Sequence, residues 1–234
     1  MAGPKLGAIL RVCRFGPAPQ AYLPALGLQR RLAALREADA IPDTLLQLQH
    51  PLVYTAGKRA KELDFRVPLE DLRARGYDVH FVERGGEVTF HGPGQAVAYP
   101  IVKLRSTRVG ARLFVEGLED VMVRTLGIYG VAARGRVPGK TGVWVGDRKA
   151  GAIGVRISRG VSSHGMSLNV KTDLTHYNNI VPCGTPEKKM TSLAKETGLD
   201  VDHVAVEDHM ARAFAAHFNY ADVQYVSPDA LEVA

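Results

Sequence analysis

A glycine-rich stretch at residues 84–95 constrains the fold of this 234-residue chain more than any other feature. Its sequence, RGGEVTFHGPGQ, contains four glycines, one proline and one histidine. Strand-like runs at residues 77–82 and 95–102 flank it, so two strands must meet there. Glycine allows left-handed dihedrals and a close approach of the backbone to a ligand. The stretch is therefore predicted to be a binding loop, although a plain glycine-rich hairpin would have the same composition.

The rest of the chain alternates strand-like and helix-like runs, which is typical of a mixed α/β or α+β fold. Strands are predicted at residues 6–15, 43–50, 52–55, 131–134, 142–145, 149–158 and 161–170. Helices are predicted at residues 20–39, 69–75, 111–126 and 174–180, and around residues 206–218. We therefore expect one domain, residues 1–234, in which helices flank a mixed β-sheet.

Acidic residues on two of these helices have predictable positions. In the helix at 111–126, apolar residues recur at helical spacing, so Glu116, Glu119 and Asp120 are expected to point to solvent. In the last helix, Glu207 and Asp208 suit the positive N-terminal end of the helix dipole.

No apolar run approaches the roughly 20 residues that cross a bilayer, and the chain start lacks the apolar core of a signal peptide. A cytoplasmic protein is therefore expected.

Cys13 and Cys183 are far apart and have no CxxC partner, so neither a disulfide framework nor a structural zinc is predicted. Cys13 lies in an apolar run and is expected to be a small buried residue.

Positive charge is concentrated between residues 134 and 171. This segment holds eight lysines and arginines against Asp147 alone, which gives it +7 in a chain whose total is +6. Such a segment could be merely solvated, or it could attract nucleic acid, a membrane surface or an acidic protein. Nucleic acid is disfavoured because aromatic residues make up only 7% of the chain and Trp144 is the sole aromatic residue between 134 and 149.

Cys183 is the first candidate for chemistry, because Pro182 and Gly184 predict a bent, accessible backbone around it. A reactive cysteine acts as its thiolate, which nearby lysine, arginine or a helix N-terminus favours. The basic segment could supply that charge. The alternative is an ordinary small residue in a loop.

Lys149 and two histidines are the next candidates. Lys149 begins the run KAGAIGV, whose small residues would let a ligand lie close to the backbone. Partial removal of water would help such a lysine to exchange protons, whereas a solvated lysine at a strand end is the alternative.

His91 and His164 each precede a glycine and could line the same pocket, or they could be structural. A metal site formed by these histidines with Cys183 is disfavoured, because no pair has zinc-ligand spacing.

Together these segments resemble the lipoyl(octanoyl) transferases, the octanoyltransferases of lipoate synthesis. The similarity includes RGG at 84–86, TFHGPGQ at 89–95, Lys149 with AIG at 152–154, HG at 164–165, Asn169, PCG at 182–184 and TSL at 191–193. Several motifs in the same order are far more specific than any one of them.

The resemblance implies an α/β domain shared with biotin and lipoate protein ligases, and no cofactor. It implies that Cys183 accepts the acyl group and that Lys149 activates it, with His164 in a supporting role. Octanoyl-acyl carrier protein would be the donor. Lipoyl domains of 2-oxoacid dehydrogenases and the glycine-cleavage H protein would be the acceptors. The residues implied to bind the octanoyl group and the carrier arm are Arg84, Gly85, Gly86, Glu87, Val88, Thr89, Phe90, His91, Ala152, Ile153, Gly154, Gly165, Met166 and Ser167.

An ATP-dependent lipoate ligase on the same fold is the alternative enzyme. It would activate a free acid as an acyl-adenylate, and its lysine would hold the carboxylate or phosphate. The cysteine at 183 argues against this alternative, because adenylate chemistry requires no thiol.

Overall fold

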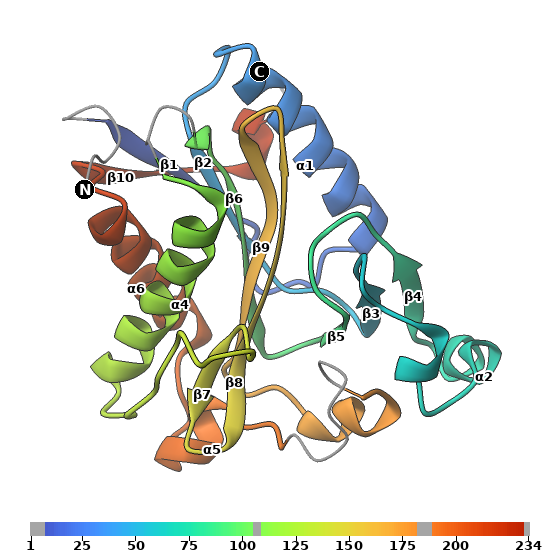
Figure 1. Cartoon of the computed structure of the whole chain (residues 1–234). Coiled ribbons are helices and arrows are strands. Elements are labelled where there is room, and N and C mark those ends of the chain that lie inside the picture. Colours follow the sequence, from blue (N-terminus) through green and yellow to red (C-terminus); the bar gives the residue numbers. More distant parts are fainter. Residues whose placement is uncertain (1–7, 105–108, 182–188, 232–234) are drawn as a thin grey trace.

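The computed structural model describes residues 8–104, 109–181 and 189–231 (Figure 1). Its larger sheet has the strand order β10-β1-β2-β6-β9-β8-β7. The bounds are β1 (Ile9–Arg14), β2 (Thr44–Leu48), β6 (Gln95–Ile101), β7 (Val143–Val145), β8 (Arg148–Ser158), β9 (Val161–Asn169) and β10 (Asp222–Val226). Strand β1 pairs in parallel with β10 and β2, and the other pairs are antiparallel, so the sheet is mixed.

Helices cover both faces of this sheet (Figure 1). Helices α4 (Ala111–Ile128) and α6 (His203–His217) pack together on one face, and α1 (Tyr22–Glu37) lies on the other. Strand β2 is buried at every position, because Leu45 packs under α4 and α6 while Leu46 packs under α1. A strand without polar alternation is expected where both faces of a sheet are covered.

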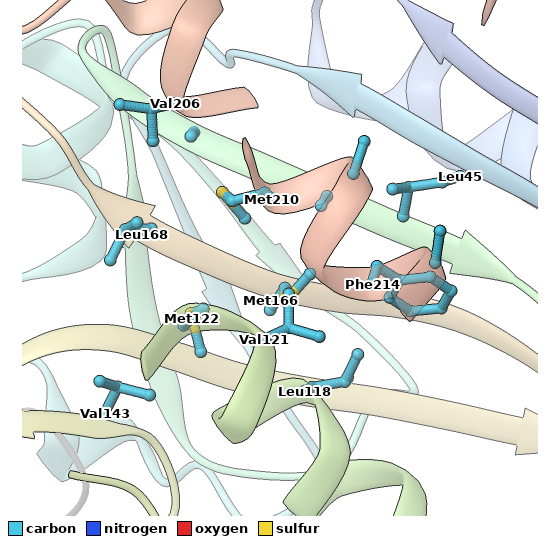
Figure 2. Packing of buried hydrophobic residues seen from close by; sticks show 14 of the residues in the cluster. Leu45, Leu118, Val121, Met122, Val143, Met166, Leu168, Val206, Met210 and Phe214 are labelled. Atoms are coloured by element: carbon cyan, nitrogen blue, oxygen red, sulfur yellow. The ribbon is translucent and has the colours of Figure 1, made fainter. Parts of the chain in front are cut away.

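The largest core lies between the sheet and the pair α4/α6 (Figure 2). Leu118 and Val121 from α4 meet Phe214 from α6, and Met166 and Leu168 of β9 face them from the sheet. Full burial of a side chain of this kind contributes about 1.5–3 kcal/mol. This core holds one face of the β8–β9 hairpin, and the opposite face of the hairpin is free to form a site.

A smaller sheet, with the order β4-β3-β5, lies beside the first (Figure 1). Its strands are β3 (Val53–Ala56), β4 (Asp78–Phe81) and β5 (Val88–His91). Helix α2 (Leu69–Ala74) and the 3₁₀ helix η2 (Leu174–Asn179) pack with it around Tyr54 and Phe90. Further short helices among the described residues are η1 (Glu62–Asp64), α5 (Leu193–Thr197) and η4 (Pro228–Leu231).

The mixed sheet flanked by helices confirms the predicted fold, but the stretch 84–95 is not entirely a loop. Strand β5 occupies its centre and pairs antiparallel with β3. Val88, Thr89 and Phe90 are residues that favour strands, and pairing satisfies their backbone groups. Only the glycine-containing segments before and after β5 form turns.

Other local predictions were wrong. Glu119 was expected at the surface but is 2% exposed. Helix α6 begins at His203 with Asp202 as its N-cap, so Glu207 lies beyond the first turn and is buried. The strand expected at 131–134 is reduced to a single bridge between Arg134 and Trp144. Strand β10 and helix α5 were not predicted.

Candidate active site

A cavity of about 210 Å³ lies between the β8–β9 hairpin and strand β5. An apolar cavity of about 150 Å³ is large enough to bind benzene, so this one has room for a short acyl chain. Its lining comes from α1, η2, β5, β6, β8 and β9, from the turns before β5 and β7, and from the segments at residues 59 and 190. Segments that are far apart in the sequence therefore meet at one site.

Most residues that the sequence predicted for substrate binding border this cavity. They are Arg84, Gly86, Glu87, Val88, Thr89, His91, Ala152, Ile153, Gly154, Gly165, Met166 and Ser167, together with Lys149 and His164. Phe90 does not form the predicted wall, because alternation along β5 turns it toward the core of the small sheet. Its ring centroid lies 4.8 Å from that of His176. Gly85 is also outside the lining, and its N–H donates to the Val155 carbonyl at 2.8 Å.

The register of β8 and β9 places small residues on one face of the hairpin and bulky residues on the other. Three successive pairs are Ala152–Ser167, Ile153–Met166 and Gly154–Gly165. The first and third pairs share one face of the hairpin, which is the face toward the cavity. The side chain of Met166 lies on the opposite face, in the core under α4 and α6 (Figure 2). The side chain of Ile153 packs against the same core. The cavity wall is therefore made of small side chains and exposed backbone.

Arg84 places a buried guanidinium against this wall. The group is 6% exposed, and it donates to Thr55 Oγ1 at 2.9 Å and to the Gly85 carbonyl at 2.9 Å. A Cβ atom at residue 154 would lie 2.9 Å from Arg84 Cδ, so Gly154 is what lets the arginine lie across β8.

Lys149 is buried at the start of β8, with 4% of its surface exposed. Its Nζ atom lies 5.6 Å from the centroid of the Trp144 ring, within range of a cation–π interaction. Gly142 has a φ of +122°, and a Cβ there would lie 2.5 Å from Lys149 Cε. The backbone at residue 142 therefore closes over the lysine and holds its amine at the cavity wall.

Cys183 lies outside the described residues, together with Pro182 and Gly184. The described residues on either side make main-chain hydrogen bonds, and those after the gap reach the site. The Val181 N–H donates to the Asp64 carbonyl at 2.7 Å, and the Lys149 N–H donates to the Lys189 carbonyl at 2.9 Å. The chain that leaves residue 188 therefore runs directly beside Lys149.

His91 is fixed by a chain of buried hydrogen bonds. Gln95 Nε2 donates to a main-chain carbonyl at 3.1 Å and to Asn169 Oδ1 at 3.0 Å, so its Oε1 faces His91 Nδ1 at 2.7 Å. An amide oxygen only accepts, so Nδ1 of His91 carries the proton and Nε2 is an acceptor. Asn169 Nδ2 donates in turn to the Thr191 carbonyl at 3.0 Å, which links this wall to the segment beside Lys149.

His164 has a left-handed backbone inside β9, with a φ of +54°. Its N–H donates to Oε1 of Gln29, a fully buried residue of α1, at 2.7 Å. Residues other than glycine are strained in this conformation, and such strain is often found at functional sites. Helix α1 therefore holds this part of the cavity wall in place.

Three neighbouring histidines are held neutral. Burial, with a smaller contribution from nearby positive groups, lowers the pKa of His91 and of His164 to about 3. Burial also lowers the pKa of His50 to about 4. His50 Nε2 lies 2.8 Å from Tyr99 Oη, and its Nδ1 donates to the Gln20 carbonyl, so Nε2 is the acceptor. These rings can accept hydrogen bonds throughout the neutral pH range.

We expect the free energy of unfolding to fall as the pH drops below about 6.5, because the unfolded chain then binds protons at His50, His91 and His164 that the folded protein does not. The stability is complete above the unfolded pKa and is lost progressively toward pH 3, by roughly 2 kcal/mol per histidine at pH 5. Urea unfolding at pH 7.5 and pH 5 measures this. Carboxylates in ion pairs, such as Glu196, bind protons only below about pH 4.5, so they do not change the free energy of unfolding between pH 7.5 and pH 5. Equal stabilities at the two pH values would therefore contradict the histidine assignment.

The basic segment is largely neutralised in three dimensions. Five of its eight cations have acidic partners on other elements. The pairs are Arg136–Asp120, Arg148–Glu196, Arg156–Glu83, Arg159–Glu37 and Lys171–Asp200. The cations that lie close together in the sequence therefore do not form a continuous positive patch. At the cavity itself, Arg59 and Lys140 are the exposed basic residues of the lining.

Sequence reasoning missed several residues that border the cavity. They are Tyr22, Arg59, Tyr99, Gly139, Lys140, Thr141, Tyr177 and Met190. Lys140 was counted only as a charge of the basic segment and Arg59 lies in a basic cluster typical of a solvated turn, while the others lie in ordinary strands, helices or turns. Within the described ranges, no group of three or more histidine, cysteine or acidic side chains could hold a metal ion.

Comparison with known proteins identifies the class. Residues 21–215 match the family model for the lipoyl protein ligase A/B catalytic domain. The chain is 48% identical over 203 residues to the mitochondrial octanoyltransferase LIP2 of Arabidopsis thaliana, which covers 86% of each chain. It is 40% identical over 207 residues to the octanoyltransferase of Alkaliphilus metalliredigens, covering 88% of this chain and 94% of the relative.

Two solved structures share the fold. A lipoate protein ligase homologue from T. acidophilum with bound lipoic acid has a TM-score of 0.72 at 16% identity, over 96% of this chain and 92% of that one. Lipoate-protein ligase A bound with ATP has a TM-score of 0.72 at 15% identity, over the same shares of the chains. At these identities the likeness concerns the fold alone.

The chain thus belongs to the lipoyl protein ligase A/B catalytic domain family. Within that family it is an acyltransferase of the octanoyltransferase group, and its reaction is octanoyl transfer in lipoate biosynthesis.

Proposed function

We propose that the protein transfers an octanoyl group from octanoyl-acyl carrier protein to a lysine of a lipoyl domain, through a thioester on Cys183 that Lys149 helps to form. The observation that carries this proposal is the position of Lys149. Its buried amine stands at the wall of a cavity large enough for the acyl chain, and the segment that follows residue 188 is hydrogen-bonded beside it.

The proposed reaction has two balanced steps. The Cys183 thiol gives its proton to Lys149 and its sulfur attacks the donor thioester, so the carrier leaves as a thiol that takes the proton back. The acceptor lysine amine then attacks the enzyme thioester, an amide forms, and the Cys183 thiol is restored. A nucleophile divides one transfer into two easier ones, and a positioned acid–base group typically contributes 10²–10⁴-fold. No ATP is consumed, because the donor is already a thioester.

The cavity wall suits an acyl chain. Ala152, Gly154 and Gly165 leave the backbone exposed along β8 and β9, and Thr89, which alternates with Val88 and Phe90 along β5, also borders the cavity. Each buried methylene of the chain contributes about 0.8 kcal/mol. Tyr22, Tyr99 and His164 also border the cavity, and we propose that they limit the length of chain that can be accommodated.

The proposed partners are acidic proteins. Octanoyl-acyl carrier protein would be the donor, and the acceptors would be lipoyl domains of 2-oxoacid dehydrogenases and the glycine-cleavage H protein. Because most of the basic segment is paired internally and Arg59 faces Glu87 at 3.9 Å, we assign their attraction to Lys140, an exposed cation at the cavity. Such steering weakens as salt rises.

A donor assay separates this function from that of a lipoate ligase. With octanoyl-acyl carrier protein and a lipoyl domain, we expect octanoylation of the domain without ATP, measured by mass spectrometry of the intact domain. Free octanoate with ATP and Mg²⁺ is expected to give no product. Product in the second assay alone would refute the proposal and support the ligase.

The location in the cytoplasm stays a prediction. Across the described part of the chain, no helix has the length and apolar character needed to cross a bilayer.

A further inference from the structure

The buried carboxylate of Glu119 binds the segment that closes over Lys149. Glu119 lies on α4 and is 2% exposed. Its Oε2 accepts the N–H of Arg136 at 2.6 Å, and its Oε1 accepts the N–H of Gly142 at 2.7 Å. A carboxylate that accepts main-chain N–H groups forms strong, charge-assisted hydrogen bonds. These two bonds fix both ends of segment 136–142 to one helix.

Segment 136–142 depends on this support because it has little regular structure of its own. Arg136 has a φ of +55°, and one turn is closed by a bond from the Lys140 N–H to the Val137 carbonyl at 2.9 Å. At residue 135 the backbone passes so near to α4 that a Cβ would lie 2.7 Å from the Cβ of Glu119. A left-handed arginine persists only where its surroundings hold it.

The other side of the same segment forms the cavity wall next to Lys149. Residues 139–141 border the cavity, and Gly142 lies against the Lys149 side chain. Trp144 joins these parts, since its Nε1 donates to the Lys140 carbonyl at 3.1 Å and its ring lies 5.6 Å from the amine of Lys149. A displacement at Gly142 would therefore reach the lysine directly.

We propose that Glu119 is a positioning residue of the transfer reaction, which holds segment 136–142 against Lys149 and so fixes the place of its amine. Glu119 touches no substrate and acts through Gly142. The expected effect on turnover rests on the proposed function of Lys149, whereas the effect on the surroundings of the amine does not.

The substitution Glu119→Gln tests this with almost no change in size. An amide nitrogen cannot accept, so one main-chain N–H loses its acceptor and faces another donor. Trp144 is the single tryptophan of the chain, so its fluorescence reports on this segment. We expect a red-shifted emission, acrylamide quenching that is about threefold stronger, and a Lys149 amine modified about threefold faster, as mapped by peptide mass spectrometry. We expect kcat to fall about tenfold with little change in KM, as for the loss of one charge-assisted bond.

Glu116→Gln is the matched control, because Glu116 lies on the same helix and its ion pair among the described residues is with the exposed Arg112. It should change none of these quantities. Unchanged quenching and unchanged Lys149 modification in a folded Glu119→Gln protein would overturn the proposal.

If Glu119→Gln does not fold, amide hydrogen exchange of the wild type tests whether Glu119 holds the two main-chain N–H groups. Slow exchange at Arg136 and Gly142 supports the proposal, and exchange at the rate of unprotected amides overturns it. Lys149→Ala, measured in parallel, keeps the two hypotheses apart. Full activity of that variant would remove the catalytic role of Lys149 while leaving the fluorescence and modification results for Glu119 valid.

Discussion

Replacement of Cys183 by alanine is expected to reduce octanoyl transfer by at least about 10⁴-fold, because the variant lacks the sulfur that receives the acyl group. The wild type, incubated with octanoyl-acyl carrier protein but no acceptor, should gain the mass of one octanoyl group. Peptide mapping should find this group on Cys183. The variant should gain nothing, and its donor should remain intact.

The second cysteine of the chain supplies a matched control. Cys13 lies in β1, fully buried under α1, and burial raises its pKa to about 11, so it stays a thiol at neutral pH. Cys13→Ala should retain its activity within about twofold and should still form the adduct. Full activity in Cys183→Ala, or an adduct on Cys13 in the wild type, would refute the covalent route.

Substitution of Lys149 by alanine is expected to slow the formation of the acyl adduct by about 10²–10⁴-fold, because the thiol then loses its proton acceptor. Single-turnover mixing with the donor, followed by mass spectrometry of the protein, measures this step apart from the later transfer. The protein should remain folded, because the cavity can admit water where the side chain was.

Lys140 provides the comparison, since its amine lies at the same 5.6 Å from the Trp144 centroid but is exposed. We expect Lys140→Ala to raise KM for the donor a few-fold and to leave kcat nearly unchanged, as suits a residue that attracts an acidic partner. A kcat loss in Lys140→Ala equal to that in Lys149→Ala would mean that the buried amine has no special role.

The sequence was a good guide to the fold wherever local pattern and tertiary environment agree. The long helices and the β8–β9 hairpin follow directly from apolar periodicity and glycine-containing turns. Strand β10 was missed because its sequence, DVQYV, is short and half exposed, and pairing with β1 is what makes it a strand. That pairing is a contact across most of the chain, which a local pattern does not contain.

The residues of the candidate site were likewise predictable only where a local sequence pattern indicates them. Motifs indicated most residues of the cavity lining, because a loop that must approach a ligand needs glycine and a small-residue strand beside it. Glu119 was expected at the surface, since an acidic residue between apolar positions of a helix normally faces water. The main-chain N–H groups that bind it come from a segment with no pattern of its own, so nothing local signals its burial. Phe90 was assigned to the wall because the motif alone does not tell which face of β5 it takes.

The alternating register of β8 and β9 places acyl-chain binding and protein stability under the control of different residues of one hairpin. Residues that shape the acyl-binding face and residues that stabilise the interior occupy different positions in the same strands. Evolution can therefore change the preferred acyl chain length through substitutions at 152 or 167 with little loss of stability, whereas substitutions at 153 or 166 change mainly the stability. Position 154 is constrained to glycine, because Arg84 lies across it.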